Sequence, residues 1–166
     1  MNVVPDSTAS PERRPVDRWF GNYSADHRNP LNQRIHVIAV PLILWSVIAL
    51  LWVIPVPAVL GRPGAWAGLA MAFSTLFYYR LSRPLGLVMA LQFVALGLVT
   101  HLLMQALGSS GLLYLAIAVF VLAWIAQFIG HRYEGKKPSF LTDLVYLLIG
   151  PAWVVGKLMR RLRISI

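Results

Sequence analysis

The chain has four histidines and no cysteine, so imidazole is the side chain to consider first as a metal ligand. Three of the histidines, His27, His36 and His131, stand beside the ends of long apolar runs. Three neutral imidazoles can bind a divalent transition metal and leave coordination positions open for other ligands. If the fold brings these side chains together, they form a predicted metal site.

Further polar side chains accompany these histidines. Asn32 stands four residues before His36, and Gln127 stands four residues before His131. Side chains four residues apart share a helix face, so the amides could orient the imidazoles. Glu134 could be a further metal ligand or a general base. The polar residues nearest to the histidines in the sequence are Asp26, Asn29, Asn32, Gln127 and Glu134.

A second interpretation is that these are ordinary polar residues at a membrane surface, without a catalytic role. Gln127 argues against it because it lies inside an apolar run. Polar side chains within membrane spans are costly, tend to face the protein interior and are often functional.

The composition indicates a membrane protein. Hydrophobic residues make up 58% of the chain and charged residues 13%, with a mean hydropathy of +0.66. Soluble domains average roughly 45–50% apolar and about 25% charged residues, so lipid must cover the excess here. The net charge of +9 fits an anionic membrane surface, and no nucleic-acid motif is present, so no nucleic-acid partner is expected.

The apolar runs predict an all-α fold, a polytopic membrane bundle of four transmembrane helices plus a fifth re-entrant or interfacial helix. Each of the four runs is near the ~20 residues that cross a bilayer. The fifth run carries Asp143 and a Gly150-Pro151 break, so it could span, re-enter or lie along the interface. In order, the five runs are residues 35–54, 65–79, 85–107, 111–130 and 140–156.

Loop charges predict the orientation of this bundle. With the N-terminus in the cytoplasm, the inside segments carry most of the Lys and Arg, whereas the outside segments carry only Arg62. The basic residues after the fifth run would lie outside if that run crossed fully, so we expect it not to cross. Both termini and the three histidines are then cytoplasmic. The fourth histidine, His101, lies roughly 24 Å along the third helix, near the opposite face, and is not expected in the site.

Three regions are expected along the chain. Residues 1–16 are predicted to be a disordered arm, because they are rich in proline and charge. Residues 17–159 form the membrane helical domain, which begins with an interfacial helix, and residues 160–166 form a basic tail that binds lipid headgroups.

Two motifs in combination are similar to a known family. The first is YSADHRNPLNQRIH at residues 23–36, followed by Val40-Pro41. The second is QFIGHRYEGKKPSF at residues 127–140, followed by Asp143 and by GPAW at residues 150–153. Together they resemble the small family of membrane 2-hydroxy fatty acid dioxygenases found in yeast endoplasmic reticulum and in bacteria. The resemblance covers residue 17 to about residue 153.

The resemblance implies an iron(II)-dependent α-oxidation. A long-chain 2-hydroxy fatty acid would react with O₂ and lose its carboxyl carbon, which leaves an acid one carbon shorter. The matching ligands are His27, His36 and His131, and zinc could replace iron in a purified sample because it binds such ligands more tightly. The spacing from His131 to Glu134, with Gly135 next, looks more like the bacterial branch of the family, which leaves the substrate open.

The same resemblance suggests how substrate would bind. The acyl chain would lie between helices, and a basic side chain near the histidines would neutralise the carboxylate. The basic candidates are Arg28, Arg34, Lys136 and Lys137. The expected location is the inner membrane in a bacterium, or the endoplasmic reticulum in a eukaryote.

Two other classes of function stay open. A lipid-binding or scaffolding membrane protein could use the same polar cluster as a structural metal site. A transporter is less favoured, because no inverted repeat or pair of broken helices is visible. Iron content and oxygen consumption would separate the enzyme from the scaffold.

Overall fold

The computed structural model describes residues 14–138 and 143–166, which contain five α-helices, one 3₁₀ turn and no strand. The all-α prediction is therefore confirmed for this part of the chain. Residues 1–13 of the predicted arm and the first residues of the predicted fifth run lie outside the described residues. The helices are α1 (Pro15–Ala25), α2 (Pro30–Val53), α3 (Ala65–Leu81), α4 (Arg83–Glu134) and α5 (Tyr146–Arg161), with the turn η1 (Ala58–Leu60) before α3.

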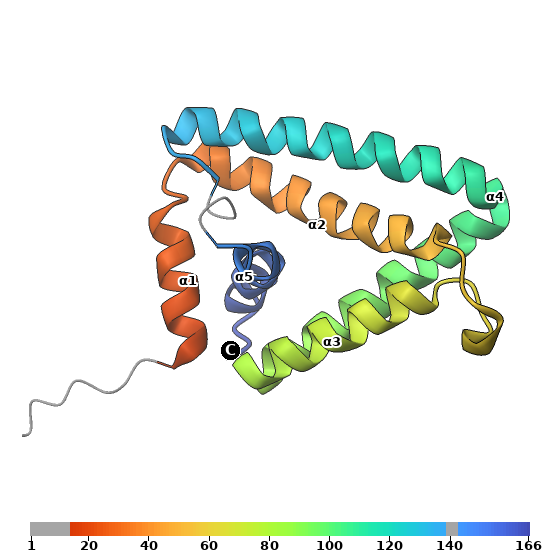
Figure 1. Ribbon diagram of the computed structural model, residues 1–166. Helices are drawn as coiled ribbons and strands as arrows, with labels where there is room; N and C mark the ends of the chain where they lie inside the picture. Colours follow the sequence, from red (N-terminus) through yellow and green to blue (C-terminus); the bar gives the residue numbers. More distant parts are fainter. Residues whose placement is uncertain (1–13, 139–142) are drawn as a thin grey trace, which may run out of the picture.

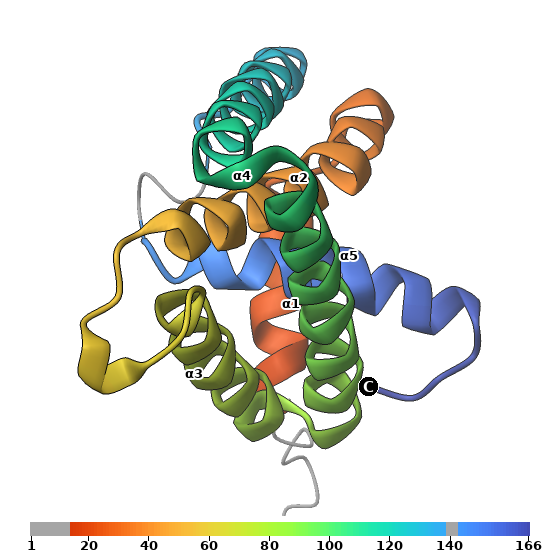
Figure 2. The same cartoon turned by 90° about the vertical axis from the view of Figure 1, so that its right-hand side faces the viewer.

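The helices form two arms that diverge from one end of the molecule (Figure 1). In one arm, α2 lies beside the C-terminal half of α4, and in the other, α3 lies beside the N-terminal half of α4. The short helices occupy the open end, where α5 runs across the arms rather than along them (Figure 2). Because α1 packs on α5, the two close the space between the arms at that end.

The bend that separates the arms lies at Gly108 in α4. This residue has φ 68° and ψ 177°, a backbone conformation that glycine adopts without steric cost. A straight helix of 52 residues would be roughly 78 Å long, more than twice the ~30 Å of a bilayer core. The sequence predicted two helices joined by a turn at residues 108–111. The structure has these two helical halves, and the break between them is a kink at which Gly108 alone departs from helical geometry.

Two of the described helices, α2 and α4, are long and apolar enough to cross a membrane, rather than the four that were predicted. The third and fourth predicted runs form the two halves of α4 on either side of Gly108, and α3 has only 17 residues. The arms nevertheless expose large apolar side chains, such as Ile38, Leu91 and Phe73, which are 66–71% exposed. A soluble surface rarely shows such a patch, so lipid is the expected environment.

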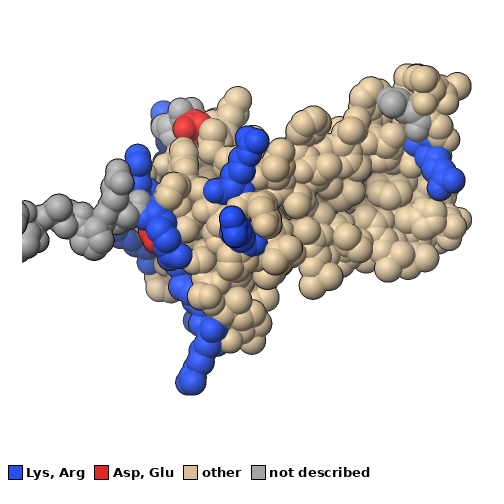
Figure 3. Space-filling view, turned by 90° about the horizontal axis from the view of Figure 1, so that it is seen from below, with Lys and Arg blue, Asp and Glu red and all other residues tan. Residues whose placement is uncertain are grey.

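Charge is distributed unevenly over this surface. On the face that Figure 3 shows, Lys and Arg side chains gather around the end of the molecule that carries α1 and α5, and the middle of that face is uncharged. This is the distribution expected for a bundle whose basic end faces an anionic headgroup layer.

The predicted fifth element is α5, which begins at Tyr146 and continues through Arg161. Its middle is buried from Ile149 to Trp153, and its last turn is basic. At the ends of the described helices, Val16 is buried within α1, and Arg160 and Arg161 stand in the last turn of α5. The α1–α5 contact is close, since a Cβ atom on Gly156 would lie 2.5 Å from the ring of Phe20.

Candidate metal centre

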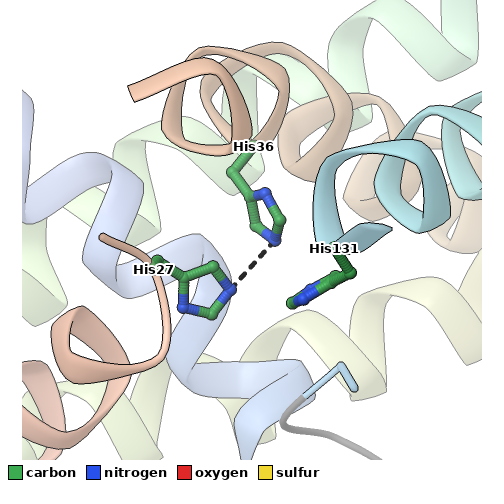
Figure 4. Close-up of side chains that lie close together, drawn as sticks. All are labelled: His27, His36 and His131. Atoms are coloured by element: carbon green, nitrogen blue, oxygen red, sulfur yellow. Dashed lines mark hydrogen bonds between the residues drawn. The ribbon is translucent and has the colours of Figure 1, made fainter. Parts of the chain in front are cut away.

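The three predicted histidines converge at the open end of the arms, although they come from separate elements. His27 lies in the loop between α1 and α2, His36 in the second turn of α2, and His131 in the last turn of α4. Their side chains are buried, with 1%, 1% and 6% exposed. Each offers one nitrogen, and these nitrogens lie within 4.8 Å of one another (Figure 4). His101 is exposed and hydrogen-bonds Gln105 instead, so it lies outside the group.

Backbone carbonyls set the protonation of two of the rings. Nδ1 of His27 lies 2.6 Å from the carbonyl oxygen of Tyr23, and Nδ1 of His36 lies 2.9 Å from that of Asn32. A carbonyl only accepts, so each Nδ1 must carry a proton, which leaves the Nε2 lone pair free in the neutral ring. The two Nε2 atoms are 3.1 Å apart. Two lone pairs at this distance repel each other unless a cation or a proton lies between them.

The geometry fits a divalent metal. With metal–nitrogen bonds of roughly 2.0–2.1 Å, two imidazoles on one ion have nitrogens about 3 Å apart. His131 adds a buried Nδ1 that has no hydrogen-bond partner among the described residues. An unpaired buried polar atom costs about 1–3 kcal/mol, which ligation would offset. The donor set therefore suits a transition metal that prefers nitrogen ligands.

The electrostatic environment keeps His27 available as a ligand. Burial lowers the pKa of His27, and this effect exceeds the opposing effect of its hydrogen bond to Tyr23. The ring of Tyr23 stacks on that of His27, with centroids 4.0 Å apart. The neutral form of His27, which is the form that binds metal, is therefore favoured at neutral pH.

Glu134 lies outside the group of three histidines and anchors the loop that carries His27. Its carboxylate accepts hydrogen bonds from the backbone N–H groups of Arg28 and Asn29, at 2.8 and 2.9 Å, and from Nδ2 of Asn32 at 2.9 Å. These donors stand at the start of α2, where the helix dipole also favours a negative charge. His131 is one turn earlier on α4. The carboxylate therefore links the end of α4 that carries His131 to the loop that carries His27 and to the first turn of α2, which precedes His36.

The amide side chains that were predicted to orient the histidines make contacts that differ from one another. The side chain of Asn29 caps α2 by accepting from Leu31 and Asn32, and its own Nδ2 donates to the carbonyl of Tyr133. Asn32 contacts His36 through its backbone carbonyl, not through its side chain. Gln127 is buried and lines the cavity described below.

The predicted basic residues lie at the surface. Arg28, Arg34, Lys136 and Lys137 are all exposed, and Lys136 binds Asp26 and the carbonyl of Ala25. A basic contact that was not predicted reaches the loop of His27. Gln33 donates to the carbonyl of His27 at 2.7 Å and accepts from Lys157 at 2.6 Å. This contact of Lys157 was not predicted, because its place beside Gln33 depends on how α5 crosses α2.

An apolar cavity of about 380 Å³ extends from the histidines between the arms. Its wall includes all three rings at one end, and side chains of α2 continue it as far as Leu51. No Lys, Arg, Asp or Glu is among the described residues that line it. The volume is within the usual range for small-molecule sites. The apolar side chains contributed by α2 are Val40, Ile43, Leu44, Val47, Ile48 and Leu51.

Comparison with known proteins identifies relatives that cover most of the chain. Residues 14–162 match the family model described as "2-hydroxy-palmitic acid dioxygenase Mpo1-like". The chain belongs to the Mpo1-like family. It is 30% identical over 147 residues to the 2-hydroxy-palmitic acid dioxygenase MPO1 of Saccharomyces cerevisiae, an alignment that covers 86% of this chain and 79% of the yeast protein. No solved structure matches the chain. The resemblance drawn from the two motifs is thus confirmed for this Mpo1-like chain.

We expect Glu134→Ala to weaken metal binding about 10–100-fold, because three N–H donors lose their acceptor and the His27 loop is released from α4. Chelator competition with zinc on the purified protein measures this. Asp17→Ala is the matched control, since it removes a carboxylate that pairs with Arg14 at an exposed site. Equal zinc affinity in both variants would contradict the anchoring role of Glu134.

Proposed function

We propose that this Mpo1-like protein is an iron(II)-dependent dioxygenase that shortens long-chain 2-hydroxy fatty acids by one carbon. The observation that carries the proposal is a buried group of three histidines at the end of a long apolar cavity. The printed name of the yeast relative supports the substrate class.

The proposed reaction balances with O₂ as the only oxidant. The bond between C1 and C2 of the 2-hydroxy acid breaks, C2 becomes the carboxyl carbon of the shortened acid, and C1 leaves as CO₂ with formation of water. The electrons that O₂ accepts come from the alcohol carbon and the carboxyl carbon, so no further reductant is needed. Iron(II), when bound, would supply the redox chemistry that lets O₂ react with such a substrate.

The residues of this chain would contribute position and environment. The carbonyls of Tyr23 and Asn32 hold the protons on Nδ1 of His27 and His36, so both Nε2 atoms point into the site. The apolar wall excludes water, which strengthens every electrostatic interaction inside. Since no cationic side chain is among the described lining residues, the substrate carboxylate would have no direct ion pair there. The surface residues Arg28, Arg34, Lys136 and Lys137 would act at longer range, by attracting anionic lipids and fatty acids.

The cavity suits a long acyl chain. From His36 to Leu51 along α2 is roughly 22 Å at 1.5 Å per residue. A carboxyl end placed at the histidines would leave the alkyl chain along the apolar side chains of α2. Burying each CH₂ group contributes about 0.8 kcal/mol, which favours long substrates over short ones.

We further propose that α2, α3 and the two halves of α4 all cross the membrane, with α1 and α5 at its cytoplasmic face. The bend at Gly108 makes each half of α4 about as long as one crossing. Both termini and the histidines would then be cytoplasmic, in the inner membrane of a bacterium or the endoplasmic reticulum of a eukaryote. The membrane domain would span residues 17–159.

The proposed activity predicts that protein reconstituted with iron(II) without air converts 2-hydroxypalmitate and O₂ into the acid one carbon shorter. Replacing His27, His36 or His131 with Ala should lower the yield at least about 100-fold. His101→Ala is the matched control and should retain activity, since His101 is remote and exposed. Mass spectrometry follows the product. Iron-loaded wild-type protein that gives no product at any chain length would favour a non-enzymatic lipid-binding role.

Filling the far end of the cavity should shift the preferred substrate length. Met71 lines the cavity, and a Cβ atom on Gly97 would lie 3.7 Å from Cε of Met71 and 3.8 Å from the ring of Trp52, the residue after Leu51. We expect Met71→Trp to reduce turnover of the longest 2-hydroxy acids about tenfold and to spare shorter ones, because one extra buried ring removes space only there. Phe73→Trp, on the lipid-facing side of the same helix, is the control. A uniform loss across chain lengths would contradict this orientation of the acyl chain.

The proposed topology predicts a cytoplasmic C-terminus. A fluorescent protein fused after Ile166 should fluoresce in cells, whereas an alkaline phosphatase fused there should be inactive. The opposite pair of results would show that α5 crosses the membrane, or that one of the arms crosses it a different number of times.

A further inference from the structure

Gln127 is a polar residue in the wall of the cavity, and the proposed reaction gives it no role. Its side chain is 6% exposed, lines the cavity and stands one helical turn before His131. Its Oε1 atom is buried and has no hydrogen-bond partner among the described residues. A buried acceptor without a donor is costly, so the position is suited to a ligand that brings an O–H or N–H group.

Two other amide oxygens of the described residues are buried and unpaired, on Asn32 and Gln92. Neither residue lines the cavity, so neither can meet a molecule bound there. Asn32 also donates to Glu134, which places its side chain in the anchor between α2 and α4. Gln127 therefore differs from both by combining an unpaired acceptor with direct access to the site.

The position of Gln127 relative to the histidines selects one part of a substrate. Side chains four residues apart on a helix have Cβ atoms about 5–6 Å apart, so Oε1 can reach a group that lies beside the ligand cluster. A fatty acid whose carboxyl end is at the histidines presents its C2 atom next. The only hydrogen-bond donor at that carbon in a 2-hydroxy acid is the hydroxyl group.

We propose that Oε1 of Gln127 accepts the hydrogen bond of the substrate 2-hydroxyl group, which makes Gln127 a residue that selects 2-hydroxy acids over unsubstituted fatty acids. The inference rests on the proposed function and deepens it. An unsubstituted acid leaves Oε1 buried and unpaired, so the site penalises that acid. Sites built to pair a substrate hydroxyl discriminate strongly against analogues that lack it.

Binding without turnover tests this inference. Zinc-loaded protein in detergent is titrated with 2-hydroxypalmitate and with palmitate, and affinities are measured by calorimetry. Gln127→Met retains an unbranched side chain of similar length but no amide. We expect this variant to bind 2-hydroxypalmitate about tenfold more weakly than wild type, while its affinity for palmitate is unchanged or higher. Gln92→Met is the matched control and should leave both affinities unchanged.

The possible binding results distinguish a wrong role for Gln127 from a wrong proposed function. If wild type prefers 2-hydroxypalmitate and Gln127→Met keeps the same preference, the role of Gln127 is wrong and the proposed function stands. If Gln127→Met loses zinc, Gln127 supports the metal and not the hydroxyl group, which also overturns the inference. If wild type binds neither acid, both the inference and the proposed substrate fall.

Discussion

The structure depends on one electrostatic constraint, the approach of two imidazole lone pairs. Nε2 of His27 and Nε2 of His36 lie 3.1 Å apart, while the opposite nitrogen of each ring donates to a backbone carbonyl. Neither ring can turn without breaking its hydrogen bond to that carbonyl. A divalent cation between the two nitrogens, with His131 as a third donor, removes the repulsion and satisfies a buried atom.

The helices around this point are arranged so that three distant segments can meet. The carboxylate of Glu134 ties the end of α4 to the start of α2, and Gly130 lets the two helices approach closely. A Cβ atom on Gly130 would lie 2.5 Å from Oδ1 of Asn32. The opposite arm diverges at Gly108, which leaves space for the cavity between the arms. The close contact at Gly130 and the divergence at Gly108 thus place the three histidines at one end of the apolar cavity.

Much of this arrangement could be predicted from sequence, because membrane topology limits where residues can lie. Loop charges grouped His27, His36 and His131 at one face and separated His101 from them, and the structure has the same grouping. Other features depend on three-dimensional contacts that no spacing reveals. The backbone donors that engage Glu134 carry no sequence signal, and the contact between Lys157 and Gln33 exists only because α5 crosses α2. The break in α4 was predicted at residues 108–111, because glycine and serine there favour a turn, and the kink lies at Gly108.

The most direct test of the account is X-ray absorption at the iron edge of protein loaded with iron(II) without air. We expect imidazole scattering from three histidines on a single iron, and the loss of one imidazole in His131→Ala with the other two retained. A wild-type spectrum without imidazole scattering, or one that is identical in wild type and His131→Ala, would show that the three histidines do not hold the metal.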